Sequence, residues 1–170
     1  MNKMKKARII LIFLTMAVLS DCDNTSSDKN KETTLFLLLC RGPNEISFND
    51  GSQYTWYSPD GFKTPATVGP SELSGYYGAR FLKDSLINEI DVYWIGTSIS
   101  QQTFTQASAN FNFAYIKNGV SYQKNTGYLF TLTISSVGCR ALGSFSGTLL
   151  KVPSGPDTIT ISGTFDSACQ

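Results

Sequence analysis

Apolar and polar side chains alternate with a period of two along much of the chain. Residues 110–115 and 128–135 alternate in this way, and the longest run is 86–95, where two sets interleave: Leu86, Asn88, Ile90, Val92 and Trp94 with Ile87, Glu89, Asp91, Tyr93 and Ile95. Successive side chains of a strand point to opposite faces, so each run predicts a β-strand. No window carries an apolar stripe at helical spacing. The pattern predicts an all-β domain, a single antiparallel β-sandwich or flattened barrel of about eight to ten strands.

Two short segments between alternating runs have the residues of hairpin turns. Asn118-Gly119 accepts positive φ at both central positions of a two-residue turn. Asn49-Asp50-Gly51 is predicted to form a three-residue loop, with the glycine in the left-handed conformation. That loop sets Ile46 opposite Tyr54 and keeps the apolar residues on one face, whereas a two-residue loop would mix the faces.

The C-terminal part of the chain predicts a long hairpin around the loop Val152–Pro156. A hairpin centred on Ser154 places two phenylalanines opposite two glycines, Phe145 with Gly163 and Phe165 with Gly143. A ring beside a bare backbone fits well across a ladder. The other face of the same hairpin carries only hydroxyl side chains, namely Ser144, Ser146, Thr148, Thr160, Ser162 and Thr164. A slip of one residue would mix these faces, so the pattern favours this register.

The first residues have the features of a secretory signal. Four basic residues, Lys3, Lys5, Lys6 and Arg8, precede the apolar run Ile9–Leu19, which is shorter than a typical membrane-spanning helix. The sequence LSDC that ends at Cys22 resembles the bacterial lipobox, in which the cysteine becomes the acylated first residue of the mature protein. We therefore predict a lipoprotein signal peptide over residues 1–21 and a lipid anchor on Cys22. An ordinary secreted protein and an uncleaved signal anchor are the alternatives.

The segment after Cys22 is predicted to be a flexible tether. Asp23–Thr34 contains no aliphatic or aromatic residue, so it cannot bury enough surface to fold. This divides the chain into a lipidated tether over residues 22–34 and a folded domain over 35–170. Removal of residues 1–21 leaves 10 basic and 12 acidic residues without a basic cluster. That balance argues against nucleic acid as a partner.

The register of the C-terminal hairpin also places Cys139 opposite Cys169. An exported protein enters an oxidising compartment, so we predict a disulfide between these two cysteines. Cys40 offers two competing pairings. It ends the apolar run Leu35–Cys40, which we interpret as a strand buried on both faces, and we therefore expect a buried, inert thiol at Cys40.

The segments GSFSGTL and TITISGTFD, preceded by FAYIKNGVSYQKNTGYLFTLTIS, resemble the C-terminal half of small β-sandwich lipoproteins found in Bacteroidetes envelopes. The likeness covers residues 109–168, about a third of the chain. Most members of that family have no assigned activity. The resemblance therefore implies a β-sandwich fold and a location in the bacterial cell envelope, with the outer membrane or cell surface favoured over the inner membrane. It implies no catalytic residue.

Candidate chemistry in the sequence is sparse. The chain contains no histidine, which removes the usual catalytic triads and most transition-metal sites. Glu89 and Asp91 share one face of a predicted strand, and two acids at that spacing are interpreted as a solvated face. Asp50, Asp60 and Asp157 lie in predicted turns, where aspartate commonly bonds its own backbone. We predict no catalytic residue, no metal site and no cofactor.

Aromatic residues are the stronger functional indication. Candidate ligand-binding residues are Tyr54, Trp56, Tyr57, Tyr76 and Tyr93, because exposed rings stack on sugars or pack against partners. The expected function is that of a membrane-anchored, non-catalytic lipoprotein that binds or scaffolds an envelope protein. The alternatives are a carbohydrate-binding module that uses exposed aromatics and a lipocalin-like carrier of a small apolar ligand, which would need a closed barrel with a cavity.

Overall fold

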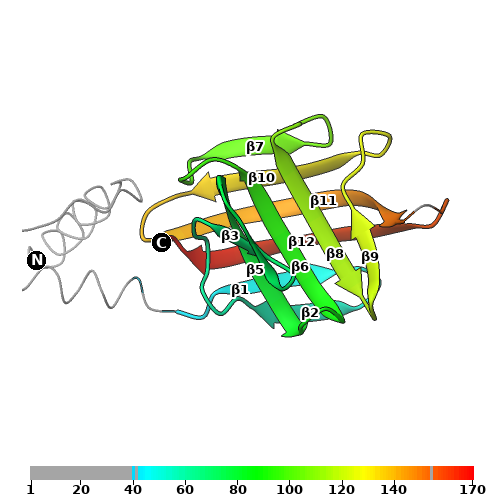
Figure 1. Cartoon of the computed structure of the whole chain (residues 1–170), viewed down its shortest axis with the longest axis horizontal. Helices are drawn as coiled ribbons and strands as arrows, with labels where there is room; N and C mark the ends of the chain where they lie inside the picture. Colours follow the sequence, from blue (N-terminus) through cyan, green and yellow to red (C-terminus); the bar gives the residue numbers. More distant parts are fainter. Residues whose placement is uncertain (1–39, 41, 154) are drawn as a thin grey trace, which may run out of the picture.

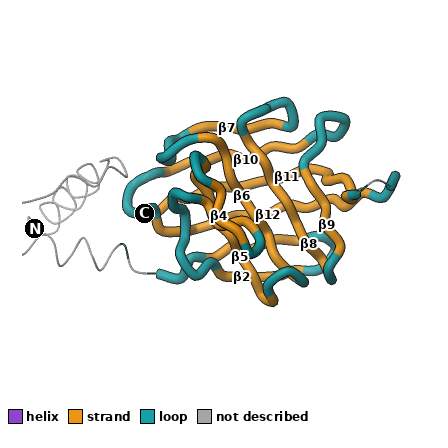
Figure 2. The backbone as a smooth tube through the Cα atoms, viewed as in Figure 1, coloured by secondary structure: helices purple, strands orange, loops and turns teal. Residues whose placement is uncertain are grey.

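The computed structural model describes residues 40, 42–153 and 155–170, and this part of the chain contains strands and loops without a helix (Figures 1 and 2). The predicted signal peptide, the tether, Cys22 and the run 35–39 lie outside the described residues. The twelve strands are β1 (Glu45–Asn49), β2 (Gln53–Tyr57), β3 (Ala66–Val68), β4 (Ser71–Leu73), β5 (Tyr76–Asp84), β6 (Asn88–Ile95), β7 (Gln102–Thr105), β8 (Phe111–Lys117), β9 (Val120–Gln123), β10 (Phe130–Ser136), β11 (Arg140–Val152) and β12 (Thr158–Ala168).

Ten strands form one antiparallel sheet in the order β12-β1-β2-β5-β6-β8-β9-β11-β10-β7. Because β11 also pairs with β12, eight of these strands close into a flattened barrel, and β10 and β7 extend from β11. The thirteen residues of β11 make this branch: its first part pairs with β10 and its last residues pair with β9. Figure 1 shows β5, β6 and β8 crossing obliquely over the layer of β10, β11, β12 and β1. The predicted all-β class and architecture are confirmed.

Aromatic side chains fill the space between the two layers. The inward positions of the alternating strands supply the core, whose largest fully buried side chains include Phe48, Phe62, Tyr77, Phe81, Phe113, Tyr115 and Phe130. The core rings pack in two sets, one around Phe48 and Tyr115 and a larger one that includes Phe104 and Phe111, whose centroids are 4.5 Å apart. Burial of an apolar side chain contributes about 1.5–3 kcal/mol, so this core supplies most of the driving force for folding.

The register of the C-terminal hairpin is confirmed residue by residue. Phe145 pairs with Gly163 and Gly143 pairs with Phe165. The ring of Phe165 occupies the space that a side chain at position 143 would need, because a Cβ added to Gly143 would lie 2.2 Å from its Cζ atom. The outward residues of both strands are the predicted serines and threonines, so the period-two pattern fixed which face is buried.

The two predicted turns have different outcomes. Lys117 pairs with Val120 around Asn118-Gly119, and both turn residues have positive φ, as predicted. In the first hairpin the loop has three residues, but it is Asp50-Gly51-Ser52, so Ile46 lies opposite Trp56 and not opposite Tyr54. The observed register differs from the predicted one by two residues. Because side chains alternate with a period of two, the apolar residues stay on the same face. Asn49 stays in the strand opposite Gln53, and its side chain accepts a hydrogen bond from the Gly51 amide at 2.8 Å.

The predicted Cys139–Cys169 disulfide is wrong, although the register behind it is right. Cys169 lies beside Cys139 and donates its amide to the Cys139 carbonyl at 3.2 Å. The disulfide joins Cys139 to Cys40, with 5.5 Å between their Cα atoms. Cys40 is half-buried in a turn, so the expectation of a buried thiol in a strand is also wrong at this residue.

Arg140 supplies the physical reason for this pairing. Its guanidinium donates hydrogen bonds to the carbonyls of Cys40, Gly42 and Pro43. These contacts hold the start of the described chain against the first residues of β11 and bring Cys40 within bonding distance of Cys139. Segments that are 99 residues apart in the sequence are joined there, and a local alternating pattern carries no information about such a contact.

Candidate functional site

The structure separates the five aromatic candidates. Trp56 is buried and Tyr54 is half-buried against Phe48, with the Tyr54 and Phe48 ring centroids 5.2 Å apart, so these two residues belong to the core. Tyr57 is 53% exposed at the end of β2. Tyr76 and Tyr93 lie together on the outer face of β5 and β6, with ring centroids 5.8 Å apart. The candidates therefore do not form one site.

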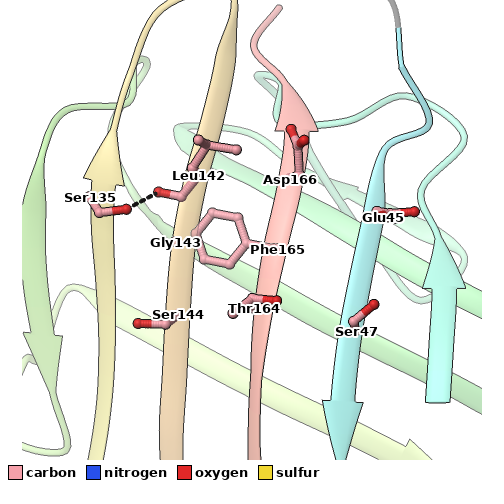
Figure 3. Close-up of a pocket in the computed structure, with 9 residues that line it drawn as sticks. All are labelled: Glu45, Ser47, Ser135, Leu142, Gly143, Ser144, Thr164, Phe165 and Asp166. Atoms are coloured by element: carbon pink, nitrogen blue, oxygen red, sulfur yellow. Dashed lines mark hydrogen bonds between the residues drawn. The ribbon is translucent and has the colours of Figure 1, made fainter. Parts of the chain in front are cut away.

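A groove of about 370 Å³ lies on the outer face of β1, β10, β11 and β12 (Figure 3). Its lining residues are Glu45, Ser47, Ser135, Leu142, Gly143, Ser144, Thr164, Phe165 and Asp166. Strand pairing brings them together, because Glu45 lies opposite Asp166 and Ser47 opposite Thr164. Short hydroxyl side chains make the floor shallow, and larger side chains stand at one end.

The two carboxylates of the groove differ in their surroundings. Asp166 accepts a hydrogen bond from Nε of Arg140 at 2.6 Å, and the guanidinium of Arg140 balances its charge. Glu45 makes no hydrogen bond or ion pair with any residue that the structure describes. Tyr57, the most exposed of the aromatic candidates, lies next to Glu45 across the β1–β2 ladder. The groove therefore has one carboxylate that can accept hydrogen bonds and an aromatic ring beside it.

The hydroxyls of the groove floor are also available to a ligand. Ser144 and Thr164 make no side-chain hydrogen bond within the described part of the chain. Ser135 donates to the carbonyl of Leu142 at 3.1 Å, which leaves its oxygen lone pairs as acceptors (Figure 3). A ligand with many hydroxyl groups therefore meets hydrogen-bond donors and acceptors at these three residues of the floor.

Glu89 and Asp91 form a second polar cluster, and the prediction that they are solvated is wrong. Their exposed fractions are 0% and 2%. The hairpin of β3 and β4 packs on the outer face of β5 and β6 and covers them, with Gly69 in its turn beside Glu89. One oxygen of each carboxyl group is buried without a hydrogen-bond partner among the described residues.

Arg80 of β5 compensates part of this buried charge. Its Nε atom lies 3.4 Å from a Glu89 oxygen, its Nη1 donates to the Gly69 carbonyl, and its Nη2 donates to the Ser85 hydroxyl at 2.7 Å. Burial and the adjacent Glu89 carboxylate raise the pKa of Asp91 to about 8. At neutral pH Asp91 therefore keeps its proton, and the Arg80 guanidinium lies beside the pair.

Space beside this cluster is too small for a substrate. The hollow between Arg80, Thr67 and the loop at Pro59 has a volume of about 20 Å³, which is enough for about one water molecule. Perturbed carboxyl groups often mark catalytic sites, but a covered pair next to such a small hollow has a structural role in this conformation. The cluster holds the β3–β4 hairpin on the barrel.

A third polar cluster closes one end of the barrel. Asp50 lies in a turn, as predicted, and its carboxylate also accepts a hydrogen bond from the Tyr115 hydroxyl at 2.6 Å and pairs with Lys117 at 2.7 Å. Burial raises the pKa of Asp50, but the hydrogen bonds from Lys117 and Tyr115 outweigh it and hold the pKa below its usual value. Asp60 and Asp157 pair with Lys63 and Lys151 on the surface.

Sequence reasoning missed the groove, although the signal was partly present. The hydroxyl faces of β11 and β12 were predicted, and they form the floor. What the sequence did not show is that β1 pairs with the far side of β12, because those strands are more than a hundred residues apart. That pairing brings Glu45 and Ser47 to the groove. The Glu89–Asp91 cluster could have been predicted from the sequence, because Arg80 lies opposite Asp91 in the β5–β6 hairpin.

Comparisons with known proteins identify no relative: no family model, no curated protein and no solved structure matches this chain. Among the described residues, no group of three or more Cys, Asp or Glu side chains is placed to hold a metal ion. The same residues include no helix that is long and apolar enough to cross a membrane. The resemblance to envelope lipoproteins stays a prediction, and the assignment of function rests on the geometry of the groove.

Proposed function

We propose that this protein is a membrane-anchored, non-catalytic envelope lipoprotein whose barrel domain binds carbohydrate in the groove at Glu45. The observation that carries the proposal is a carboxylate without a partner among the described residues, placed between an exposed tyrosine and a floor of hydroxyl side chains. Cys22 is the proposed point of lipid attachment, and the segment 22–34 is the proposed tether.

The chemistry of a sugar suits each part of this groove. Sugar hydroxyls donate hydrogen bonds to a carboxylate such as that of Glu45, and they both donate to and accept from Ser and Thr hydroxyls. The apolar face of a sugar ring packs on an exposed aromatic ring, here that of Tyr57. A groove with several hydroxyl side chains, one carboxylate that is not paired with a described residue and one exposed ring beside it therefore favours a hydroxyl-rich ligand.

Two other functions receive less support. A carrier of an apolar ligand needs space inside the barrel, and aromatic rings from all the long strands occupy that space. A protein partner usually binds to a contiguous apolar patch. Within the part of the chain that the structure describes, the exposed large apolar side chains lie at separate turns and strand ends, and Leu142 is the member of this set that lines the groove; the others are Tyr57, Leu86, Ile87, Ile95, Tyr128, Leu129 and Val152.

Glycan-array screening of the full-length protein, followed by calorimetric titration of any positive glycan, tests the proposed ligand. Glu45→Gln and Tyr57→Ala should each weaken binding by about tenfold or more, because each removes a contact worth about 1.5 kcal/mol or more. The matched controls are Glu72→Gln on β4 and Tyr128→Ala in the β9–β10 loop, both exposed and outside the groove. No binding to any glycan, or equal losses in the controls, contradicts the proposal.

Intact-mass spectrometry of protein extracted from membranes tests the proposed anchor separately. The expected mature chain begins at Cys22 and carries a diacylglyceryl group, and in many hosts an additional amide-linked acyl chain. More than one acyl chain is needed for stable attachment, because a single chain gives only marginal binding. A mature chain that begins at another residue, or a Cys22→Ser variant that stays bound to the membrane, contradicts the anchor and leaves the ligand proposal in place.

A further inference from the structure

Six hydroxyl side chains form an unbroken row across the outer face of six neighbouring strands. Each pair of neighbours in the row is a register pair of adjacent strands, and the row runs from β2 to β7 as Thr55, Ser47, Thr164, Ser144, Thr133 and Thr103. We call this set the hydroxyl row. The groove covers its middle, since Ser47, Thr164 and Ser144 line it. The row continues past the groove on both sides.

A parallel row lies two residues along each strand. It consists of Gln53, Asn49, Ser162, Ser146, Thr131 and Thr105, again as successive register pairs. The two rows together contain twelve positions and no charged side chain. A solvated protein surface typically carries charge at about a quarter to a third of its positions, so about three or four charges would be expected here. This face differs from an ordinary solvated surface.

The dimensions of the row suit a long ligand. Neighbouring strands lie about 4.8 Å apart, so six strands span about 24 Å, and the two rows are separated by about 6.8 Å along the strands. Short Ser and Thr side chains leave the path along the row open, whereas long charged side chains would cross it. A single sugar ring in the groove would contact only part of this surface.

The charge of the surface selects a neutral ligand. Glu45 and Asp166 stand beside the row, and the cation near them, Arg140, is held by Asp166 and three backbone carbonyls. Glu45 would repel an anionic chain, because it forms no ion pair with any residue that the structure describes. A neutral polyol requires hydroxyl partners alone, and each Ser or Thr hydroxyl can both donate and accept.

We infer that the ligand is a linear, neutral polysaccharide that lies across the strands along the hydroxyl row, from Thr55 to Thr103. This inference rests on the proposed carbohydrate-binding function and adds the length, direction and charge of the ligand. Ser47 with Thr55 and Thr103 with Thr133 form hydrogen-bonded pairs at 3.0 Å and 3.2 Å, and each pair keeps one hydroxyl hydrogen and free oxygen lone pairs for a chain passing over it.

Calorimetric titration of the full-length protein with cello-, xylo- and manno-oligosaccharides, from disaccharide to octasaccharide, tests the inference. Affinity for at least one series should rise with chain length until the sugar spans the row. The double variant Thr103→Val with Thr133→Val keeps both β-branched shapes and removes two hydroxyls beyond the groove. It should weaken binding of the longest oligosaccharide by about tenfold and leave the disaccharide unchanged, because two hydrogen bonds are each worth about 0.5–1.5 kcal/mol.

The matched control is Thr148→Val with Thr160→Val. These residues form the same kind of cross-strand hydroxyl pair at 3.3 Å on the same face, but they belong to neither row. The control should bind every oligosaccharide as the parent protein does. Circular dichroism of both double variants establishes that the fold is retained.

The outcomes separate this inference from the proposed function. One outcome is that short and long oligosaccharides bind equally well, that Glu45→Gln weakens their binding and that the Thr103 and Thr133 substitutions do not. In that case the ligand does not follow the hydroxyl row, and the proposal of a groove site is retained. A second outcome is that the Thr103 and Thr133 substitutions weaken binding of long chains while Glu45→Gln has no effect. In that case the inference about the hydroxyl row is retained, and the role of Glu45 in the proposed function is wrong. Stronger binding of anionic than of neutral chains overturns the inference. If these series do not bind and the array finds no glycan, both proposals are wrong.

Discussion

The outer faces of the two layers of this barrel use the same sequence pattern for different purposes. The open face, on β1, β2, β7, β10, β11 and β12, presents short uncharged hydroxyls to solvent. The covered face, on β5 and β6 beneath the β3–β4 hairpin, holds Arg80, Glu89 and Asp91 in a buried cluster. In both layers polar residues alternate with core residues. The difference arises from what packs on the outside, because a covered polar group needs a partner and an exposed one does not.

This comparison separates residues kept for stability from residues available for binding. On the covered face, removal of one charge leaves another buried without compensation. On the open face, hydroxyls and Glu45 contact mainly solvent, so their substitution changes little within the protein. Effects on stability should therefore come from the covered face and effects on binding from the open face. The following predictions test that division, from the largest effect to the smallest.

The largest effect on stability is expected from pH. The pKa of Asp91 is raised from 3.8 to about 8 in the folded protein, so between these values the folded state holds one proton more than the unfolded state. This contribution to stability is fully present below pH 3.8 and is lost as pH rises to about 8. The measurement is urea unfolding as a function of pH. Asp91→Asn removes the titrating group and should flatten this dependence; an unchanged slope in that variant would contradict the assignment.

Asp50 at the barrel end should have the opposite dependence. Because the pKa of Asp50 is held below 3.8, its contribution is present above that pH and is lost as acid protonates it. Stability should therefore be highest at about pH 4, between the acid loss at Asp50 and the loss at Asp91 as pH rises. Asp50→Asn should weaken the loss of stability on the acid side and leave the decrease toward pH 8 in place. A change only on the alkaline side would show that the two clusters have been assigned the wrong way round.

Arg80→Met should lower the free energy of unfolding by about 3–5 kcal/mol, because it leaves the Glu89 charge buried without a partner. The control is Lys151→Met, which breaks the solvent-exposed pair with Asp157 and should change stability far less than Arg80→Met does, because an exposed ion pair contributes little. Both are measured by urea unfolding at pH 7. Equal losses in the two variants would mean that the hairpin does not bury the cluster in solution.

Cys40→Ala should lower the free energy of unfolding by about 2–4 kcal/mol, because the Cys40–Cys139 disulfide closes a long loop in the unfolded chain. Non-reducing peptide mapping of the parent protein should join the peptides that contain these two residues. Cys169→Ala should leave that cross-link in place. A peptide that links Cys139 to Cys169 would restore the pairing expected from the hairpin register and contradict the structure.

The smallest effect on stability is expected on the open face. Thr133→Val and Glu45→Gln should each change the free energy of unfolding by about 0.5 kcal/mol or less, since both side chains lie at a solvated surface away from packed groups. The measurement is the same urea titration that is used for Arg80→Met. A loss above about 2 kcal/mol in either variant would show that the open face has a structural role and would weaken its assignment as a binding surface.

Sequence patterns were sufficient for the local parts of the fold. The turn at Asn118-Gly119 follows from the backbone conformations that this pair accepts, and the contacts of Phe165 with Gly143 and of Phe145 with Gly163 follow from the period of two. The register of the first hairpin, β1 with β2, differs by two residues from the predicted register. In the structure the Asp50 carboxylate binds Tyr115 and Lys117, on a strand distant in sequence, and Asp50 lies in the loop.

Long-range contacts account for the remaining errors. Glu89 and Asp91 look like a solvated pair because nothing in their strand shows that residues 66–73 fold over them. Cys40 pairs with Cys139 because Arg140 holds the carbonyls of a distant segment. The groove depends on β1 joining β12. In each case the contact that determines the structure joins two segments that are distant in the sequence. The alternating pattern of each strand predicts which face is buried, but it does not specify which other segment packs against it.

The most direct test of the central claim compares one residue from each face in a single binding experiment. Glu45→Gln on the open face and Tyr93→Ala on the outer face of β6 both alter a surface position that is a candidate for glycan binding. Calorimetric titration of both variants and the parent protein with the neutral oligosaccharide that binds best should show a loss of about tenfold or more for Glu45→Gln, as expected for a hydrogen bond to a charged group. Tyr93→Ala should bind as the parent does. Loss of binding in Tyr93→Ala with no change in Glu45→Gln would place the site on the other face and contradict this account.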